Sequence, residues 1–108
     1  MLGMATNRLD ILKQMVNQDP NNTFARYGLA MEYANSGQPE QAIGEFRALI
    51  QADDGYSAAY YHGGQALEKL GRIEEARELY EKGIEASTRK GDMHTRSEIE
   101  AALSLLPI

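Results

Sequence analysis

Apolar residues recur every three or four positions along most of this chain, the spacing that places side chains on one face of an α-helix. Short runs rich in glycine, proline, asparagine and aspartate divide the pattern into six segments. The predicted helices are about Thr6–Gln18, Thr23–Asn35, Pro39–Ile50, Tyr56–Leu70, Ile73–Ser87 and Met93–Leu106, with a polar break at 88–91 after the fifth. The pattern lacks the alternation of a half-buried strand, so it predicts an all-α fold. The short connections predict antiparallel neighbours.

Several breaks carry residues that start or end helices. Asn22 and Asp92 suit the N-cap position, where a side-chain oxygen accepts a hydrogen bond from a free backbone N–H. Gly37 suits the left-handed conformation that follows a helix. Pro39 suits the first helical position, because the N–H there has no partner within the helix. We interpret Asp53-Asp54-Gly55 as a turn rather than a functional carboxylate pair.

One segment in the middle of the chain occurs twice. The run Gly37-Gln38-Pro39-Glu40-Gln41-Ala42 returns thirty-four residues later as Gly71-Arg72-Ile73-Glu74-Glu75-Ala76. Each copy is followed, at the same distance, by an aromatic residue, Phe46 in the first and Tyr80 in the second. A fixed period of this length is typical of a solenoid, in which each unit buries its apolar face against its neighbours.

The composition is that of one folded domain. Of 108 residues, 43% are hydrophobic and 25% are charged, which is ordinary for a globular chain. The net charge of −5 argues against non-specific binding to nucleic acid. The absence of cysteine excludes disulfides and thiolate sites. The chain contains no apolar run near the ~20 residues that span a bilayer, and its start lacks signal-peptide features. We therefore expect a cytoplasmic protein without membrane or nucleic-acid partners.

Few residues carry the combinations that catalysis or metal binding needs. The two histidines, His62 and His94, lie on different predicted helices and in no ligand motif. The pair Gly63-Gly64 lacks the lysine and the preceding strand of a phosphate-binding loop. His62 could form a metal site with Glu68 or Asp92 only if folding brought these residues together. We therefore expect no enzymatic activity, no cofactor and no metal.

The two units resemble the tetratricopeptide repeat (TPR) family, which places small and aromatic residues at fixed positions of a thirty-four-residue pattern. In the unit that starts at Thr23, the matching residues are Leu29, Ala30, Tyr33, Gly37, Ala42 and Phe46. In the unit that starts at Ser57, they are Tyr60, Gly64, Leu67, Gly71, Ala76 and Tyr80. Arg26 stands where the first unit should have an aromatic residue, and Gly63 replaces a leucine in the second. The second departure predicts loose packing around Gly63.

The resemblance implies an all-α, right-handed superhelical solenoid of antiparallel helix pairs, with about six helices. It covers nearly the whole chain, which we expect to form one domain over residues 1–108. The expected parts are a half repeat at 6–18, repeats at 23–56 and 57–90, and a capping helix at 92–106. Small residues would let paired helices approach closely, while Phe46 and Tyr80 fill the wedges between units.

The resemblance also implies a protein–protein interaction or adaptor function, in which a concave groove binds a peptide or a partner helix. The groove residues that it implies are Phe24, Tyr27, Met31, Tyr61, His62, Gln65 and Arg96, with Glu68, Thr95 and Ile99 as further candidates. Tyr27 and Tyr61 occupy the same position of consecutive units, where a core role is the alternative. Relatives that grip the C-terminal carboxylate of chaperones use lysine and asparagine here. Only Arg96 is of that type, so we expect this clamp to be absent.

The two ends of the chain suggest an alternative function. The first predicted helix has no partner on one side, which would leave Leu9, Leu12 and the residues near Met4 exposed. The last residues, 105–108, are also apolar. Such surfaces are typical of self-association. The alternative is therefore a homo-oligomeric structural or assembly protein, such as a homodimer that associates through its N-terminal or C-terminal helix. The opposing interpretation is that residues 1–5 fold back and cover the open side of the first helix.

Overall fold

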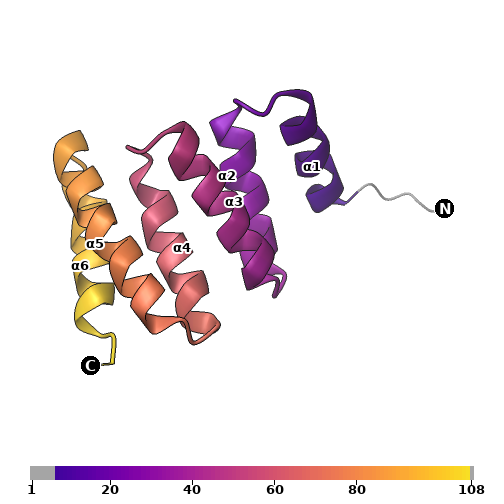
Figure 1. Ribbon diagram of the computed structural model, residues 1–108. Coiled ribbons are helices and arrows are strands. Elements are labelled where there is room, and N and C mark those ends of the chain that lie inside the picture. Colours follow the sequence, from indigo (N-terminus) through magenta and orange to yellow (C-terminus); the bar gives the residue numbers. More distant parts are fainter. Residues whose placement is uncertain (1–6, 108) are drawn as a thin grey trace.

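The computed structural model describes residues 7–107, which form six α-helices in one stack (Figure 1). The helices are α1 (Arg8–Gln18), α2 (Thr23–Asn35), α3 (Pro39–Ala52), α4 (Ser57–Lys69), α5 (Ile73–Lys90) and α6 (Met93–Ser104). Over this range there is no strand, so the all-α prediction is confirmed. None of these helices is long and apolar enough to cross a membrane. Thr6, the predicted start of the first helix, lies outside the described residues.

The predicted caps and glycine turns are confirmed. Asn22 Oδ1 accepts a hydrogen bond from the backbone N–H of Ala25 at 3.0 Å, and Asp92 Oδ1 accepts one from Thr95 at 3.1 Å. Each bond satisfies a backbone group that the helix cannot pair by itself. Gly37 has a φ of 76°, the left-handed conformation that glycine adopts without strain.

Helix α5 continues past its predicted end, so the expected break over residues 88–91 is wrong. The Thr88 hydroxyl donates to the backbone carbonyl of Ile84 at 2.6 Å, and the Ser87 hydroxyl donates to a carbonyl one turn earlier at 2.7 Å. These polar side chains bond back onto their own helix instead of ending it. The helix ends only at Gly91, whose φ is 76°.

The helices alternate in direction along the stack (Figure 1). The backbone of α4 lies close to those of both α2 and α6, whereas the backbones of α3 and α5 are farther apart and are bridged by side chains such as the Arg47–Glu75 ion pair at 3.1 Å. The stack therefore curves toward α2, α4 and α6, and these three helices line its concave side. Its dimensions of 49 × 27 × 20 Å are those of an elongated row of helix pairs.

In the core between α4 and α5, aromatic rings of one helix pack against small residues of the other. Tyr80 and Ala76 are fully buried. A Cβ atom added to Gly64 would lie 2.1 Å from a ring carbon of Tyr80, far inside van der Waals contact. A Cβ atom added to Gly83 would lie 2.6 Å from Tyr60 in the same way. The close approach that small residues predicted is confirmed at this helix pair.

The loose packing predicted around Gly63 is wrong. Gly63 is buried, and a Cβ atom added there would lie 2.9 Å from Leu79 and 3.4 Å from Phe46. These two side chains, from α5 and α3, already fill the space that the leucine of the family pattern would need. A larger residue at position 63 would clash with these side chains, so the packing requires glycine there.

Arg26, the other departure from the family pattern, forms an ion pair. Its Nη1 atom lies 2.7 Å from Oε1 of Glu45 on α3, and Nη2 donates to the backbone carbonyl of Pro20 at 3.3 Å. The two side chains are only 16% and 25% exposed. A planar guanidinium can bind both acceptors at once, so Arg26 joins α2 to α3 and to the preceding turn.

The apolar face of α1 is turned mostly toward α2. Leu12 is only 8% exposed, so the expectation that it lies on an open surface is wrong. Leu9 is half-buried beside it. The exposed apolar side chains of α1 are instead Ile11 and Met15, at 46% and 37%. Met4 lies outside the described residues.

The two leucines at the other end of the stack differ in exposure. Leu106 is 6% exposed and belongs to the core, while Leu105 is 83% exposed. Ile108 lies outside the described residues. The apolar surface expected here is therefore reduced, over the described chain, to Leu105 and Pro107.

Because Gly64 lies directly against Tyr80, we expect Gly64→Ala to destabilise the fold. Overpacking of this kind costs about 1–3 kcal/mol, more than the gain of up to about 1 kcal/mol that alanine gives over glycine inside a helix. Gly44→Ala is the matched control, since Gly44 is exposed in α3 and an added Cβ atom would meet nothing within 4 Å. This control should stabilise. Urea denaturation at constant m-value measures both, and stabilisation by both changes would contradict the packing argument.

Candidate functional site

The inner sides of α2 and α4 bring together five of the residues predicted for the groove. They are Tyr27, Met31, Tyr61, His62 and Gln65. The imidazole of His62 lies 6.1 Å from the ring of Tyr27 and 5.1 Å from that of Tyr61, measured between ring centres. Met31, His62 and Gln65 line one shallow depression of about 90 Å³ between the helices. Two consecutive units thus form one surface.

Tyr27 is half-buried and belongs to both the groove and the core. Its ring centre lies 5.3 Å from that of Tyr56 and 6.5 Å from that of Phe46. Burial raises the pKa of Tyr27, and the neighbouring Tyr56 adds to the increase. The core and groove interpretations of this residue are therefore compatible, because one part of the ring packs inward while the rest stays open to solvent.

His62 lies among these rings in an environment that favours the neutral imidazole. Phe46 stacks on it with 6.3 Å between ring centres and 20° between ring planes. Burial lowers the pKa of His62, and this effect outweighs the opposing influences of Glu98 and of a hydrogen bond with Gln65. A neutral imidazole donates through one nitrogen and accepts through the other. His62 can therefore hydrogen-bond a polar group without carrying a charge.

A larger furrow of about 410 Å³ runs between α4 and α6, and we call it the α4–α6 furrow. Its lining residues are Tyr61, Gln65 and Glu68 of α4 and Glu98, Ala101, Ala102 and Leu105 of α6. The Gln65 amide donates to the Tyr61 hydroxyl at 3.1 Å. Oε2 of Glu68 accepts a hydrogen bond from the Tyr80 hydroxyl at 2.5 Å. Burial, and then this hydrogen bond, raise the pKa of Tyr80.

Two residues predicted for the groove lie apart from the others. Phe24, in the first turn of α2, is 78% exposed and contributes to neither depression nor furrow. Arg96 pairs with Glu100 of its own helix, with 3.3 Å between Nε and Oε2. The residue of α6 that enters the furrow is Glu98. Residues two apart in a helix are separated by about 200°, so Arg96 points to a different side. Ile99, a further candidate, is fully buried.

Continuing the period of thirty-four residues into the last helix puts Arg96, and not Glu98, at the position that His62 holds in α4. The N-caps of α2 and α4, Asn22 and Tyr56, are thirty-four residues apart, but Asp92 follows Tyr56 by thirty-six. The two extra residues rotate the register of α6 by about 200°. Alignment on the N-caps, which the sequence does indicate, puts Glu98 at the position that His62 holds in α4.

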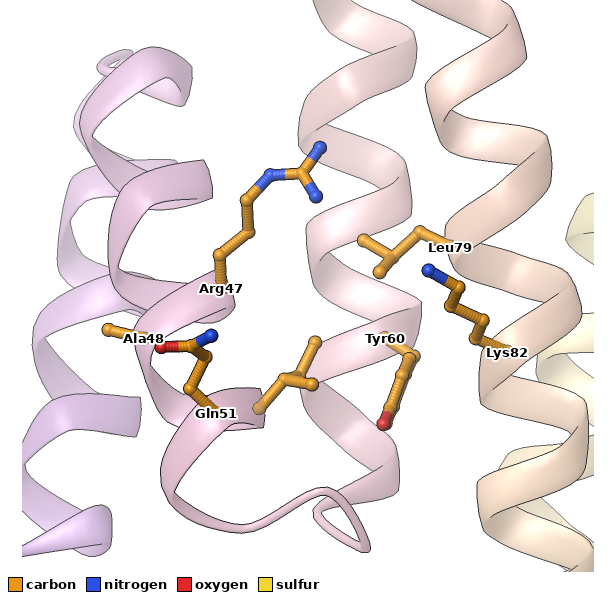
Figure 2. Close-up of a pocket in the computed structure, with 7 residues that line it drawn as sticks. Arg47, Ala48, Gln51, Tyr60, Leu79 and Lys82 are labelled. Atoms are coloured by element: carbon orange, nitrogen blue, oxygen red, sulfur yellow. The ribbon is translucent and has the colours of Figure 1, made fainter.

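A second pocket lies on the outer side of the stack, where α3 and α5 diverge (Figure 2). Its volume is about 370 Å³, and it is lined by Arg47, Ala48, Ile50, Gln51, Tyr60, Leu79 and Lys82. The Arg47 guanidinium is bound to Glu75 at 3.1 Å, and the Tyr60 hydroxyl donates to the backbone carbonyl of Asp54 at 2.7 Å. The inner surface is the candidate site because the residues predicted for the groove gather there and not in this pocket.

Asp92, one of the residues considered for a metal site, has a structural role. Its Oδ2 atom accepts a hydrogen bond from the Ser57 hydroxyl at 2.7 Å, while Oδ1 caps α6. The hydrogen bond from Ser57 is the main cause that lowers the pKa of Asp92. Across residues 7–107, no group of three histidine, aspartate or glutamate side chains is arranged to hold a metal ion.

Known proteins that resemble this chain carry the same repeat. A sequence profile of the tetratricopeptide repeat family matches residues 27–90. The TPR repeat-containing protein PA0015 of Pseudomonas aeruginosa is 27% identical over 95 residues, which are 88% of this chain and 90% of that protein. The match to the profile covers residues 27–56 of the first unit and the whole of the second.

Solved structures share the arrangement of helices. A tetratricopeptide repeat domain protein from Salinibacter ruber superposes with a TM-score of 0.72 at 33% identity, over 76% of this chain and 91% of that one. YrrB, described as a TPR protein with an unusual peptide-binding site, superposes with a TM-score of 0.80 at 27% identity. That match covers 90% of this chain and 47% of YrrB.

The lowered pKa of His62 predicts that stability falls on the acid side of neutrality. The unfolded chain takes up a proton near the ordinary value of 6.5, whereas the folded chain takes it up only at lower pH. The unfolded state therefore binds more protons in this window, and the free energy of unfolding decreases as pH falls below about 6.5. His62→Gln should weaken this dependence in urea denaturation at a series of pH values.

His94→Gln is the matched control, because it also removes an imidazole but from an exposed position. Proton NMR titration of the wild-type chain measures the pKa of His62 directly. A value at or above 6.5 would contradict the role assigned to burial.

Proposed function

This chain belongs to the tetratricopeptide repeat family, and we propose that it is a protein–protein interaction module that binds an extended peptide or a partner helix in its concave groove. The groove is the surface of α2, α4 and α6. The observation that carries the proposal is the gathering of Tyr27, Met31, Tyr61, His62 and Gln65 on one open surface. The proposed division remains a half repeat at 6–18, repeats at 23–56 and 57–90, and a capping helix at 92–106.

These side chains combine apolar area with hydrogen-bonding groups in a way that suits a peptide. Tyrosine rings offer large contact areas with few rotatable bonds, and the flexible thioether of Met31 adapts to irregular partners. His62 and Gln65 supply donors and acceptors that can fix the orientation of a bound backbone. Because Gln65 lines both the depression and the α4–α6 furrow, a bound peptide can extend from one into the other.

The peptide-binding site named for YrrB supports the same assignment, since YrrB shares this fold over most of the chain. The nature of the partner is expected to differ from that of chaperone-binding relatives. Tyr27, Met31 and His62 stand at the positions where those relatives use lysine and asparagine. Arg96, the only residue of the right type, lies on another side of α6 from Glu98. We therefore propose a partly apolar segment rather than an acidic C-terminus.

Two adjacent tyrosines allow binding to be separated from stability. Tyr61→Ala removes a half-buried ring from the groove, so it should weaken peptide binding about tenfold or more and lower stability by about 1 kcal/mol. Tyr60→Ala is the matched change. Tyr60 is 4% exposed and donates to the carbonyl of Asp54, so its loss should cost about 3–5 kcal/mol. Fluorescence polarisation with a library-selected peptide and urea denaturation give the two readouts.

The groove assignment fails if Tyr61→Ala binds the selected peptide as the wild type does. It also fails if Tyr61→Ala loses as much stability as Tyr60→Ala, because Tyr61 would then be a core residue.

Self-association through α1 is a second candidate, favoured by the exposure of Ile11 and Met15. These two residues are one turn apart and therefore share a side of the helix, which a second copy of the chain could cover. Ile11→Glu should then convert a concentration-dependent dimer into a monomer in sedimentation equilibrium. Asn17→Glu, an exposed position on another side of α1, is the control and should leave the dimer intact. A wild-type chain that is monomeric at every concentration would exclude this candidate.

A further inference from the structure

We propose that the groove takes a segment carrying a lysine or arginine side chain, which Glu98 and Glu68 attract into the α4–α6 furrow. This inference rests on the proposed function, because it names the charge of the peptide that the same groove binds. Three features carry it: the weakly paired, exposed carboxylate of Glu98, the orientation of Glu68, and the composition of the furrow between them.

Glu98 faces the furrow and is available to a ligand. Its side chain is 44% exposed, and it contacts the imidazole of His94, with 3.9 Å between Nε2 and Oε2. His94 is itself 87% exposed, so this contact is weak and easily replaced. Glu98 is also close enough to the centre of the groove to act electrostatically on His62 and Tyr27.

Glu68 is held in place by the core. The hydroxyl of Tyr80, whose ring is fully buried, donates to Oε2 of Glu68 at 2.5 Å. A neutral donor orients the carboxylate without cancelling its charge. The bond from Tyr80 goes to Oε2 alone, and Glu68 lines the furrow, so its other carboxylate oxygen is the acceptor that we assign to a cationic donor. Because α4 and α6 run in the same direction (Figure 1), Glu98 and Glu68 lie toward opposite ends of the furrow.

The furrow contains no cation of its own among its lining residues. Apart from the two carboxylates, these are Tyr61, Gln65, Ala101, Ala102 and Leu105. Charges of one sign in a concave, partly desolvated site focus the electrostatic potential. The net charge of −5 adds the same sign over longer distances. A basic segment is therefore attracted, while an acidic segment is repelled.

The apolar part of the furrow suits the rest of such a segment. The ring of Tyr61 can lie against the cation or the aliphatic stem of a lysine or arginine. Leu105, 83% exposed, offers an apolar contact at the rim. In an extended chain, residues i and i+2 point to the same side. The preferred peptide therefore has a basic residue and an apolar residue two positions apart.

Selection from a displayed library of random peptides on the folded protein tests this inference. The wild type should enrich peptides with lysine or arginine over those with aspartate or glutamate. Glu68→Gln combined with Glu98→Gln removes both charges but keeps an acceptor for the Tyr80 hydroxyl. It should abolish the enrichment and weaken the best wild-type peptide about tenfold or more. Glu81→Gln, exposed on α5 outside the furrow, is the matched control and should change neither result.

The possible failures are distinguishable. If neutral or acidic peptides are enriched, and if this enrichment is lost in Tyr61→Ala but kept in the double glutamine variant, the groove stands and the charge inference is overturned. If the double variant still selects basic peptides, the cation is bound elsewhere and the inference is also overturned. If the wild type enriches no peptide while circular dichroism shows it to be helical, both the inference and the proposed function fail.

Discussion

The reciprocal contact between α4 and α5 sets the geometry on which the rest of this protein depends. The ring of Tyr80 on α5 lies against Gly64 on α4, and the side chain of Tyr60 on α4 lies against Gly83 on α5. In both cases a Cβ atom on the glycine would clash with the facing tyrosine. Two helices that pack this closely leave little freedom in their spacing or rotation. The positions of the α4 residues proposed for the groove are therefore set by neighbouring residues that the same helix buries against α5.

This contact also links the core to the candidate site. Tyr80 is a wedge residue of the repeat, yet its hydroxyl reaches through to Glu68 in the α4–α6 furrow. Phe46, the corresponding ring of the first unit, stacks on His62. The two rings that fill the wedges between units therefore each contact one polar residue of the groove. A scaffold of this kind pre-orients its binding side chains, which reduces the entropy that binding would otherwise lose.

The groove that we propose differs from a carboxylate clamp in the sign of its charge. Tyrosine, methionine and histidine stand at the clamp positions, and Arg96 faces away from the furrow that Glu98 enters. The change follows from the spacing between N-caps, since Asp92 follows Tyr56 by two residues more than Tyr56 follows Asn22, and this turns a different side of α6 inward. A small change in the length of one helix can thus alter the electrostatics of a surface without changing the fold.

The sequence by itself determined the local structure of this protein. Six helices, the caps at Asn22 and Asp92 and the turn at Gly37 depend on residues within one or two turns of each other, and the sequence pattern was sufficient to predict them. The repeat also predicted that Tyr27 and Tyr61 lie at equivalent positions of consecutive units, and the structure places both rings beside His62.

Only the tertiary structure decided the features that depend on more distant neighbours. The tight packing at Gly63 depends on Leu79 and Phe46 from two other helices, and the burial of Leu12 depends on α2. Whether Glu98 or Arg96 faces the α4–α6 furrow depends on the number of residues between the N-caps of α4 and α6, since each added residue rotates the next helix by about 100°. Such features are properties of the whole stack, and a repeat pattern that describes one unit does not contain them.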